Sequence, residues 1–518
     1  MPTTLDWNTS DPTSWVNYPV MLATMRGLTS LGPDNTIRPG LASSWTRERT
    51  PEGHEAYTFQ LRRDVRWSDG APLVAQDFVL GWRRAAVGKE RGEVADVLGA
   101  EPVLAAIARG APKEEVDALL EGLEVRALDA HTLRIVLTRP RSYFLARMAN
   151  VYLFFPAPSA QLAGKSEEEI RAYFERPQDG HPVSLGPWRV EAWDRAGERI
   201  RLVRNPVSAF APAPIDGFVP PERVTLLRSE IGPALFERNR VGFVFVDSAI
   251  ALQQAPTADL QRRELLSTYF LGFNTERPPM DRAEVRRAIA QALDRDALLQ
   301  GLLPAARPTR TLLPPDLPGA MSAEDERRLV TYDPEAARPV LRAVDRPLRL
   351  VFKAGESFIP EVAIAERIRA QLAKVGVKVE LDARYDFSAE LARRGPDARR
   401  TFDLYLRRIG ADYAHPKTFF TLFERNGNHQ TGWETCDGGT SIRRFEALLA
   451  QGDAAADPET ARRAYTAAQL LLLREEAVIV PLYHPDRYYR RQSGLRGVEV
   501  DPFNFISLGD LQVRKDAR

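Results

Sequence analysis

The spacing of hydrophobic residues changes sharply within one stretch of the chain, residues 57–85. In its first part every second position is hydrophobic, which is typical of a half-buried β-strand: Tyr57, Phe59 and Leu61. Ser68, Asp69 and Gly70 then supply the residue types of a tight turn. Beyond the turn, hydrophobic residues recur at helical spacing, at Val74, Phe78, Trp82 and Ala85. The stretch therefore predicts a strand, a turn and an amphipathic helix.

The same two periods predict further elements along the chain. Alternation or short hydrophobic runs predict strands at residues 133–137, 199–204, 224–227, 242–246, 348–352 and 377–381. Of these, we expect 224–227 and 242–246 to be buried. Helical spacing predicts helices at residues 95–123, with a break at 110–112, and at 285–295 and 361–375. The strand–helix–strand succession of residues 348–381 predicts a parallel or mixed sheet.

Composition indicates a large folded protein. A length of 518 residues suggests about three domains, and 44% hydrophobic residues are enough to bury a core. The 71 Lys and Arg residues balance 70 Asp and Glu residues, so the net charge does not indicate binding to nucleic acid or to an anionic membrane. No apolar run reaches the length of about 18 residues that a membrane helix needs. We therefore expect neither a nucleic-acid partner nor a membrane span.

Candidate catalytic chemistry is absent from the sequence. Cys436 is the only cysteine, which excludes an intrachain disulfide and a cysteine-ligated zinc site. The six histidines show no metal-ligand spacing. The nucleophile-elbow, zinc-protease and phosphate-loop motifs are all missing. We therefore expect no metal, no cofactor and no enzymatic activity, and a peptidase would need a nucleophile and a base that the sequence does not show.

Several segments together resemble a known family. The first follows the predicted strand and consists of Trp67-Ser68-Asp69-Gly70-Ala71-Pro72, Asp77-Phe78-Val79 and Trp82-Arg83-Arg84. Further matching segments are residues 39–45, 128–132, 184–188, 205–206 and 285–295. They resemble the extracytoplasmic solute-binding proteins of family 5, above all the oligopeptide- and dipeptide-binding proteins of peptide ABC transporters.

The chain departs from the family pattern in two places. Val74 stands where the family commonly has a threonine that caps the following helix. Losing such a cap costs about 1 kcal/mol, so we expect another group to cover the free N–H groups. The Tyr-Trp pair usual shortly after Asn205-Pro206 is also missing, which leaves the solute class open.

The resemblance implies an α/β fold of the periplasmic-binding-protein type II. Such a fold has two α/β lobes joined by a two-strand hinge, plus a smaller accessory α+β lobe. The implied division gives lobe I residues 1–36, 160–267 and 484–518, the accessory lobe II residues 37–159, and lobe III residues 268–483. The chain would then cross between the large lobes near residues 268 and 484.

The N-terminus differs from that of the relatives. Residues 1–8 contain neither a basic nor an apolar export-signal region, whereas relatives usually carry an export signal, often with a lipidated cysteine. Relatives also have a short first strand before the position of Leu5-Asp6. We expect either a gene start assigned too late or a trimmed chain, rather than a protein retained inside the cell.

The strongest candidate for a binding site is the strand and loop of residues 402–413. In the oligopeptide-binding relatives, the acid of an Ala-Asp-Tyr segment holds the ligand's α-ammonium, and the resemblance carries that role onto Asp412 of Ala411-Asp412-Tyr413. A charge-assisted bond suits such a contact. The alternative is that Asp412 caps the helix that starts near Pro416 or forms an Asx turn.

The residues before Asp412 would accommodate a peptide backbone. Gly410 and Ala411 have little or no side chain, so a ligand could approach as an added strand. Arg407 and Arg408 could hold a ligand carboxylate, but neighbours on a strand face opposite sides, so at most one points inward. A surface ion pair is the alternative for either arginine.

The resemblance suggests further cleft residues. Met25-Arg26-Gly27-Leu28 matches a turn beside the ligand cleft, where Arg26 would reverse the charge of an acid, or else be a solvated surface residue. Tyr269 and Trp433 could line side-chain pockets, with packing as the alternative. His415 stands where relatives have an acidic or polar residue, so it is either a pH-sensitive group or an ordinary loop histidine.

These observations predict the extracytoplasmic substrate-binding component of an ABC importer. It would capture short peptides in an interlobe cleft and deliver them to the permease subunits, as a periplasmic or cell-surface monomer with a possible lipid anchor. One alternative keeps fold and role with another solute, such as an oligosaccharide, an opine-like compound or a metal chelate. Another is an intracellular ligand sensor, although no helix-turn-helix precedes Leu5.

Overall fold

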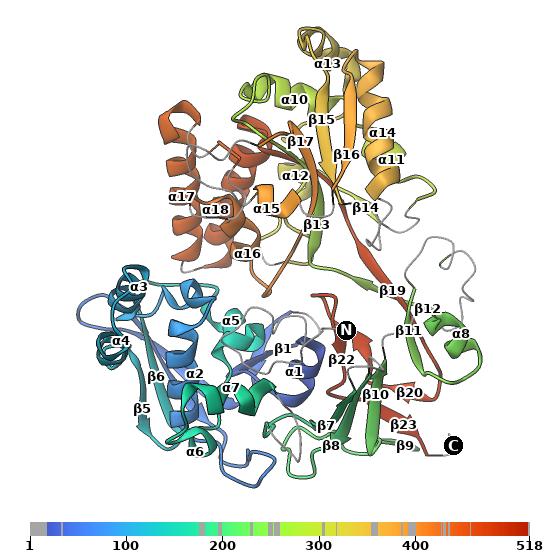
Figure 1. Ribbon diagram of the computed structural model, residues 1–518. Helices are drawn as coiled ribbons and strands as arrows, with labels where there is room; N and C mark the ends of the chain where they lie inside the picture. Colours follow the sequence, from blue (N-terminus) through green and yellow to red (C-terminus); the bar gives the residue numbers. More distant parts are fainter. Residues whose placement is uncertain are drawn as a thin grey trace. The chain divides into compact units, whose positions relative to one another are not determined.

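Figure 1 shows the computed structural model, in which the chain divides into two compact units. The first unit is Met1–Phe245 with Arg490–Arg518, and the second is Val246–Tyr489. The structure describes residues 18–515 except 33–34, 176–181, 195–198, 228–230, 247–251, 253–259, 303–305, 318, 354–360, 385–386, 392–399, 426, 428–430, 434–435 and 456. The opening segment before residue 18, including Leu5-Asp6, lies outside the described residues. The finer three-lobe division stays a prediction.

The first unit contains a four-stranded antiparallel sheet with the order β3-β4-β6-β5. Its strands are β3 (Ala42–Arg49), β4 (Glu55–Leu61), β5 (Val125–Asp129) and β6 (Thr132–Leu137). The predicted strand at residues 57–61 is therefore β4, and the predicted helix after the turn is α2 (Ala75–Val87). In the sheet register Tyr57 faces Ile135 and Phe59 faces Leu133. The alternating pattern thus buries one side of two neighbouring strands together.

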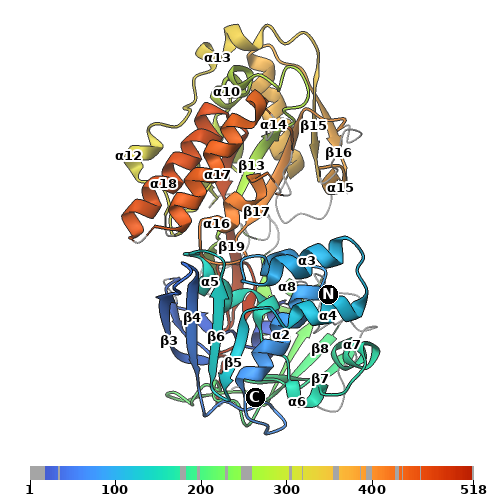
Figure 2. The same ribbon diagram turned by 90° about the vertical axis from the view of Figure 1, so that its left-hand side faces the viewer.

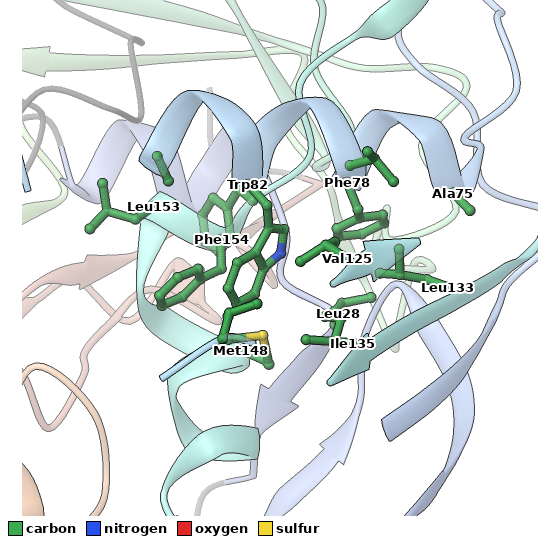
Figure 3. Close-up of a cluster of buried hydrophobic side chains, with 14 of the residues drawn as sticks. Leu28, Ala75, Phe78, Trp82, Val125, Leu133, Ile135, Met148, Leu153 and Phe154 are labelled. Carbon is green, nitrogen blue, oxygen red and sulfur yellow. The ribbon is translucent and has the colours of Figure 1, made fainter. Parts of the chain in front are cut away.

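Helix α2 lies across this sheet, as Figure 3 shows. Phe78 and Trp82 project from the helix toward Leu133 and Ile135 of the sheet. All four side chains are fully or almost fully buried. Burying side chains of this size contributes roughly 1.5–3 kcal/mol each. The change of hydrophobic period within one stretch therefore builds the two layers of this core.

The start of α2 is capped without a threonine, as expected from the sequence. The Asp77 carboxylate accepts hydrogen bonds from the Val74 N–H at 3.1 Å and from the Trp67 indole N–H at 2.9 Å. Its other oxygen accepts from the Ser159 N–H at 2.9 Å and from the Ser159 hydroxyl at 2.5 Å. The Ala75 N–H donates to the Ala130 carbonyl at 2.9 Å. The Asp77 carboxylate, from α2 itself, and the Ala130 carbonyl, from another segment, therefore take the place of the missing threonine.

The rest of the first unit consists of smaller sheets and short helices. One three-stranded sheet has the order β10-β8-β7, another has the order β20-β23-β9, and β1–β2 and β21–β22 are pairs. The strands are β1 (Thr29–Leu31), β2 (Ile37–Pro39), β7 (Trp188–Asp194), β8 (Arg199–Arg204), β9 (Phe218–Val219), β10 (Arg223–Leu227), β11 (Phe243–Phe245), β20 (Leu495–Arg496), β21 (Glu499–Val500), β22 (Ile506–Ser507) and β23 (Gln512–Arg514). The helices are α1 (Tyr18–Thr24), α3 (Ala100–Ala108), α4 (Lys113–Leu120), α5 (Phe144–Asn150), α6 (Ser159–Leu162), α7 (Glu167–Glu175) and α8 (Gly232–Glu237).

Two expectations for this unit need correction, and one is confirmed. Strands β10 and β11 form where predicted, but they are not buried: their residues alternate between exposed and half-buried, or are half-buried throughout. For β10 the reason is its position at the edge of its sheet, where only β8 pairs with it. The predicted helical region 95–123 does break at residues 110–112, between α3 and α4.

The second unit is built on a six-stranded mixed sheet with the order β14-β18-β13-β17-β15-β16. Strands β15, β16 and β17 are parallel to one another, and the other pairs are antiparallel. With β12 and β19, which lie outside this sheet, the strands of the unit are β12 (Leu260–Glu264), β13 (Ser267–Phe273), β14 (Arg307–Pro308), β15 (Leu348–Phe352), β16 (Val379–Ala383), β17 (Leu404–Gly410), β18 (Ile479–His484) and β19 (Asp486–Arg491). The mixed sheet predicted from residues 348–381 is confirmed.

Helices cover both faces of this sheet. They are α10 (Ala283–Gln291), α11 (Arg295–Leu299), α12 (Ala323–Glu326), α13 (Pro334–Leu341), α14 (Glu361–Lys374), α15 (Phe387–Leu391), α16 (Lys417–Phe420), α17 (Thr440–Asp453) and α18 (Pro458–Leu470). Leu350 and Leu404 pack with residues of α10, α13 and α14 in one core. On the opposite face, Phe270 packs edge-on against Tyr405 and Phe423. Figure 2 shows α17 and α18 side by side.

The helix predicted at residues 285–295 proves to be two helices. Helix α10 ends at Gln291, and α11 begins at Arg295. Between them the Asp294 carboxylate accepts a hydrogen bond from the Ala297 N–H at 3.1 Å and so caps α11. Among the described residues, no helix combines the length and the apolar character needed to cross a membrane.

Replacing Asp77 with alanine should destabilise the protein by about 3 kcal/mol, because buried donors on Trp67, Val74 and Ser159 then lose their acceptor. Asp117→Ala is a suitable control, since that carboxylate forms only an exposed pair with Lys113 and its loss should cost less than about 1 kcal/mol. Chemical denaturation of both variants measures the difference. Equal losses for the two would contradict the capping role of Asp77.

Candidate functional site

Strand β17 is paired along the whole of one edge and along only part of the other. Along one side it pairs with β13 over its whole length, from Leu404 opposite Phe273 to Gly410 opposite Ser267. On the other side, within the described residues, β15 pairs only with Leu404 and Tyr405. Within the described residues, positions 406–410 therefore have a strand neighbour on one side only.

The direction of the main-chain groups follows from the bonds at the two ends of this ladder. The Asn274 N–H donates to the Asp403 carbonyl at 2.9 Å, and the Ala411 N–H donates to the Leu266 carbonyl at 2.8 Å. In an antiparallel pair, bonded and non-bonded positions alternate. The odd-numbered residues of β17 therefore bond β13, and the N–H and C=O groups of Leu406, Arg408 and Gly410 face the open edge.

Asp412 follows directly after this edge. Its side chain is exposed, and its carboxylate accepts a weak hydrogen bond from the Thr418 hydroxyl at 3.4 Å. The Asp412 N–H in turn donates to the Thr418 hydroxyl oxygen at 3.1 Å. The N-cap position of α16 is occupied by Pro416, which makes no side-chain capping bond. Thr418 thus holds the loop at Asp412 and leaves the carboxylate at the surface of the second unit.

The neighbours of Asp412 form a tight framework. Ala411 and Tyr413 are both buried, so their side chains anchor the loop in the second unit. A Cβ atom on Gly410 would lie 3.0 Å from the Arg408 guanidinium and 3.0 Å from the Ser267 hydroxyl. A larger residue at position 410 would therefore displace the Arg408 side chain.

The two arginines of β17 lie on opposite faces, as the strand period requires. Arg408 is exposed and its Nε donates to the Ser267 hydroxyl at 3.1 Å. Arg407 is half-buried, and burial lowers the pKa of its guanidinium below the usual value. Neither forms an ion pair with a carboxylate among the described residues. The surface ion pair considered for them thus has no support in this part of the chain.

The aromatic candidates are packed into the second unit. Tyr269 lies opposite Tyr483 in the sheet, and the two rings stack 4.7 Å apart with an interplanar angle of 5°. Trp433 is fully buried and meets Phe445 of α17 edge-on at 5.3 Å. Packing accounts for the burial of both side chains. Residues 428–430 and 434–435, on either side of Trp433, lie outside the described residues.

Arg26 and Gly27 lie in the first unit. The Arg26 guanidinium donates to the Met25 carbonyl at 2.8 Å and to the Leu22 carbonyl, and it lies 5.6 Å from the centre of the Phe210 ring. Burial lowers the pKa of Arg26 to about 10. A Cβ atom on Gly27 would lie 2.0 Å from the Met148 carbonyl oxygen, so only glycine fits there. These contacts show Arg26 engaged with the end of α1 rather than freely solvated.

The structure therefore brings most of the predicted residues of the second unit together, but not all. Arg408 lies opposite Tyr269 in the ladder, beside Gly410 and the loop of Asp412. The described ring contact of Trp433 is with Phe445 of α17 and not with these residues. Sequence reasoning missed Ser267, the partner of Arg408, because no local pattern connects residues 141 positions apart.

His415 is held neutral. Burial and the nearby Lys417 charge lower the pKa of His415 to about 3, and its Nδ1 accepts from the Lys417 N–H at 3.1 Å. This favours the ordinary loop histidine over the pH-sensitive group. Within the described chain, no three His, Cys, Asp and Glu side chains gather so that they could hold a metal ion.

Comparison with known proteins gives a consistent result. A family model described as bacterial extracellular solute-binding proteins, family 5 Middle, matches residues 36–431. A probable deoxycholate-binding periplasmic protein of Escherichia coli is 26% identical over 90% of this chain and 83% of its own length. The periplasmic oligopeptide-binding protein of the same organism is 26% identical over 87% of this chain and 80% of its own length.

Solved structures show the same fold. The peptide-bound oligopeptide-binding protein OppA of Listeria monocytogenes superposes with a TM-score of 0.71 at 20% identity, covering 98% of this chain and 97% of that one. The predicted fold class, α/β of the periplasmic-binding-protein type II, is thereby confirmed.

His484 should make the stability of the protein fall in acid. Burial lowers its folded-state pKa from 6.5 to about 4, so the unfolded chain takes up the proton first. The contribution of neutral His484 to the free energy of unfolding is complete above about pH 6.5. It is lost as the pH falls toward 4, by up to about 1.4 kcal/mol per pH unit.

Chemical denaturation at several pH values, on the wild type and on His484→Asn, measures this slope. The variant should lose the part of the slope that the histidine supplies, while the carboxyl groups contribute equally to both proteins. Identical slopes in the two proteins would show that the ring of His484 does not carry the effect.

Proposed function

Because the chain belongs to the bacterial extracellular solute-binding proteins of family 5, we propose that it captures short peptides outside the membrane for an ABC importer. The proposal includes a periplasmic or cell-surface location and permease subunits as partners. It also includes a monomeric, non-catalytic protein without cofactor, since capture and delivery need only binding. Relatives named as oligopeptide-binding and dipeptide-binding proteins support the peptide as the solute.

One observation carries the proposal: the open edge of β17 leads directly to an exposed carboxylate. A peptide in extended form can add to that edge by pairing its main chain with Leu406, Arg408 and Gly410. Such pairing uses groups that every peptide has, so it tolerates many side chains. Asp412 then lies where the added strand would end. A hydrogen bond between an ammonium and a carboxylate is stronger than a hydrogen bond between neutral groups.

Arg408 is the cation that the same edge offers. Its Nε is engaged by the Ser267 hydroxyl, which orients the guanidinium and leaves its terminal N–H groups for an acceptor. We propose that these groups meet a carbonyl or carboxylate of the ligand. Gly410 keeps the space for that orientation, since any Cβ there would press on the guanidinium.

A second solute class is favoured by one relative. The Escherichia coli relative that is 26% identical is named as a probable deoxycholate-binding protein. Deoxycholate is an amphipathic acid without an amino terminus, so it would make no use of the carboxylate of Asp412. Mass spectrometry of ligand released from the denatured protein distinguishes the two classes. A ladder of short peptides supports the first, and a single steroid-like mass would replace it.

Replacing Asp412 with alanine should weaken the binding of a peptide with a free amino terminus by more than about tenfold. The reason is the loss of the acceptor for the ammonium. An N-acetylated peptide of the same sequence should bind the wild type weakly and should bind wild type and variant alike. Titration calorimetry measures the affinities.

Asp281→Asn is the matched control for this experiment, because Asp281 is an exposed acid of the same unit at the start of another helix. It should bind both peptides as the wild type does. Equal affinity of wild type and Asp412→Ala for the free peptide would remove the ammonium contact from the proposal, while released peptides would still support the function.

A further inference from the structure

Arg295 differs from the other buried arginines among the described residues. Six arginine side chains there are more than nine-tenths buried: Arg141, Arg147, Arg286, Arg295, Arg400 and Arg490. Five of them form an ion pair with a carboxylate. Arg295 is the exception in this group, since its Nε donates a hydrogen bond to the Pro481 carbonyl at 2.7 Å instead. The charge of its guanidinium is thus left without a described counterion.

A second cation lies beside it. Arg295 and Arg310 line one hollow in the second unit, and Arg310 likewise has no carboxylate partner among the described residues. Burial, together with the charge of Arg310, lowers the pKa of Arg295 to about 10, so the guanidinium keeps its proton at neutral pH. The acid that acts on Arg295 is its exposed chain neighbour Asp296. One buried and one half-buried arginine therefore line the same hollow, and two neighbouring like charges repel each other unless an anion accompanies them.

The rest of the hollow is apolar. Its wall consists of Ala290, Leu329, Val330, Leu473, Ile479, Val480 and Pro481. The hollow leaves about 10 Å³ for the centre of a water-sized group, which is room for about one such group.

From this arrangement we propose that the hollow between Arg295 and Arg310 binds one halide-sized inorganic anion, which in solution is chloride. The two guanidinium groups supply the charge and the N–H donors. The bound anion joins α11, through Arg295, to Arg310 in the segment after β14, and Arg295 is itself fixed to the Pro481 carbonyl of β18. It therefore stabilises the second unit and does not depend on the solute that the protein carries.

The proposal is tested by thermal unfolding of the full-length protein in sodium chloride. Sodium gluconate replaces sodium chloride in the reference samples, so that the ionic strength is the same at every chloride concentration. The melting temperature of the wild type should rise by about 2 °C and saturate with chloride. Arg310→Gln should show no saturable rise. The control Arg342→Gln, which removes an exposed arginine of the same unit, should behave as the wild type.

Crystals of the wild type grown in sodium bromide give a second readout that does not depend on any variant. An anomalous difference peak between Arg295 and Arg310 is expected. The proposal would be overturned if chloride did not raise the melting temperature of the wild type, or if it raised that of Arg310→Gln equally. A hollow without a bromide peak would also overturn it. If Arg310→Gln does not fold, the bromide map alone decides.

Discussion

Main-chain N–H and C=O groups need hydrogen-bond partners, and the function proposed here depends on where β17 lacks them. The strand is central in its sheet, yet within the described part of the chain β15 accompanies it only at Leu404 and Tyr405. The following residues keep β13 as their described neighbour. A strand that is fixed on one side and open on the other is a ready template for an extended peptide. Recognition through the main chain also explains tolerance of many sequences.

The remainder of the second unit holds this strand in place. At its start Asp403 is fully buried and accepts hydrogen bonds from Arg346 at 2.7 and 3.0 Å. At its end Thr418 fixes the loop of Asp412. Both faces of the strand are packed, with Leu404 in the core beneath α10 and α14 and Tyr405 against Phe270. A template held so firmly loses little entropy when a ligand adds to it.

The sequence could predict what local patterns and motifs encode. The change of period between Tyr57 and Ala85 gave β4 and α2 correctly, and Val74 correctly indicated that another group must cap the helix. The helix at 285–295 was predicted too long because the capping role of Asp294 competes with helix continuation. The burial of β10 was predicted wrongly because hydrophobic composition does not reveal a sheet edge.

The site could be predicted only in part for a related reason. Asp412 and Gly410 were found through a motif within a few residues of each other. The open edge, the contact of Arg408 with Ser267 and the neutral state of His484 all depend on strands far apart in the sequence. No periodicity along the chain records such pairings. The role of each predicted residue toward a ligand stays a proposal.

Hydrogen exchange with and without a saturating tripeptide tests the central claim most directly. The amides of Arg408 and Gly410 point to the open edge of β17, whereas those of Arg407 and Ile409 are already bonded to β13. The account predicts that the peptide slows exchange at Arg408 and Gly410 and changes little at Arg407 and Ile409. A peptide that binds and leaves all four amides unchanged would contradict main-chain recognition at this edge.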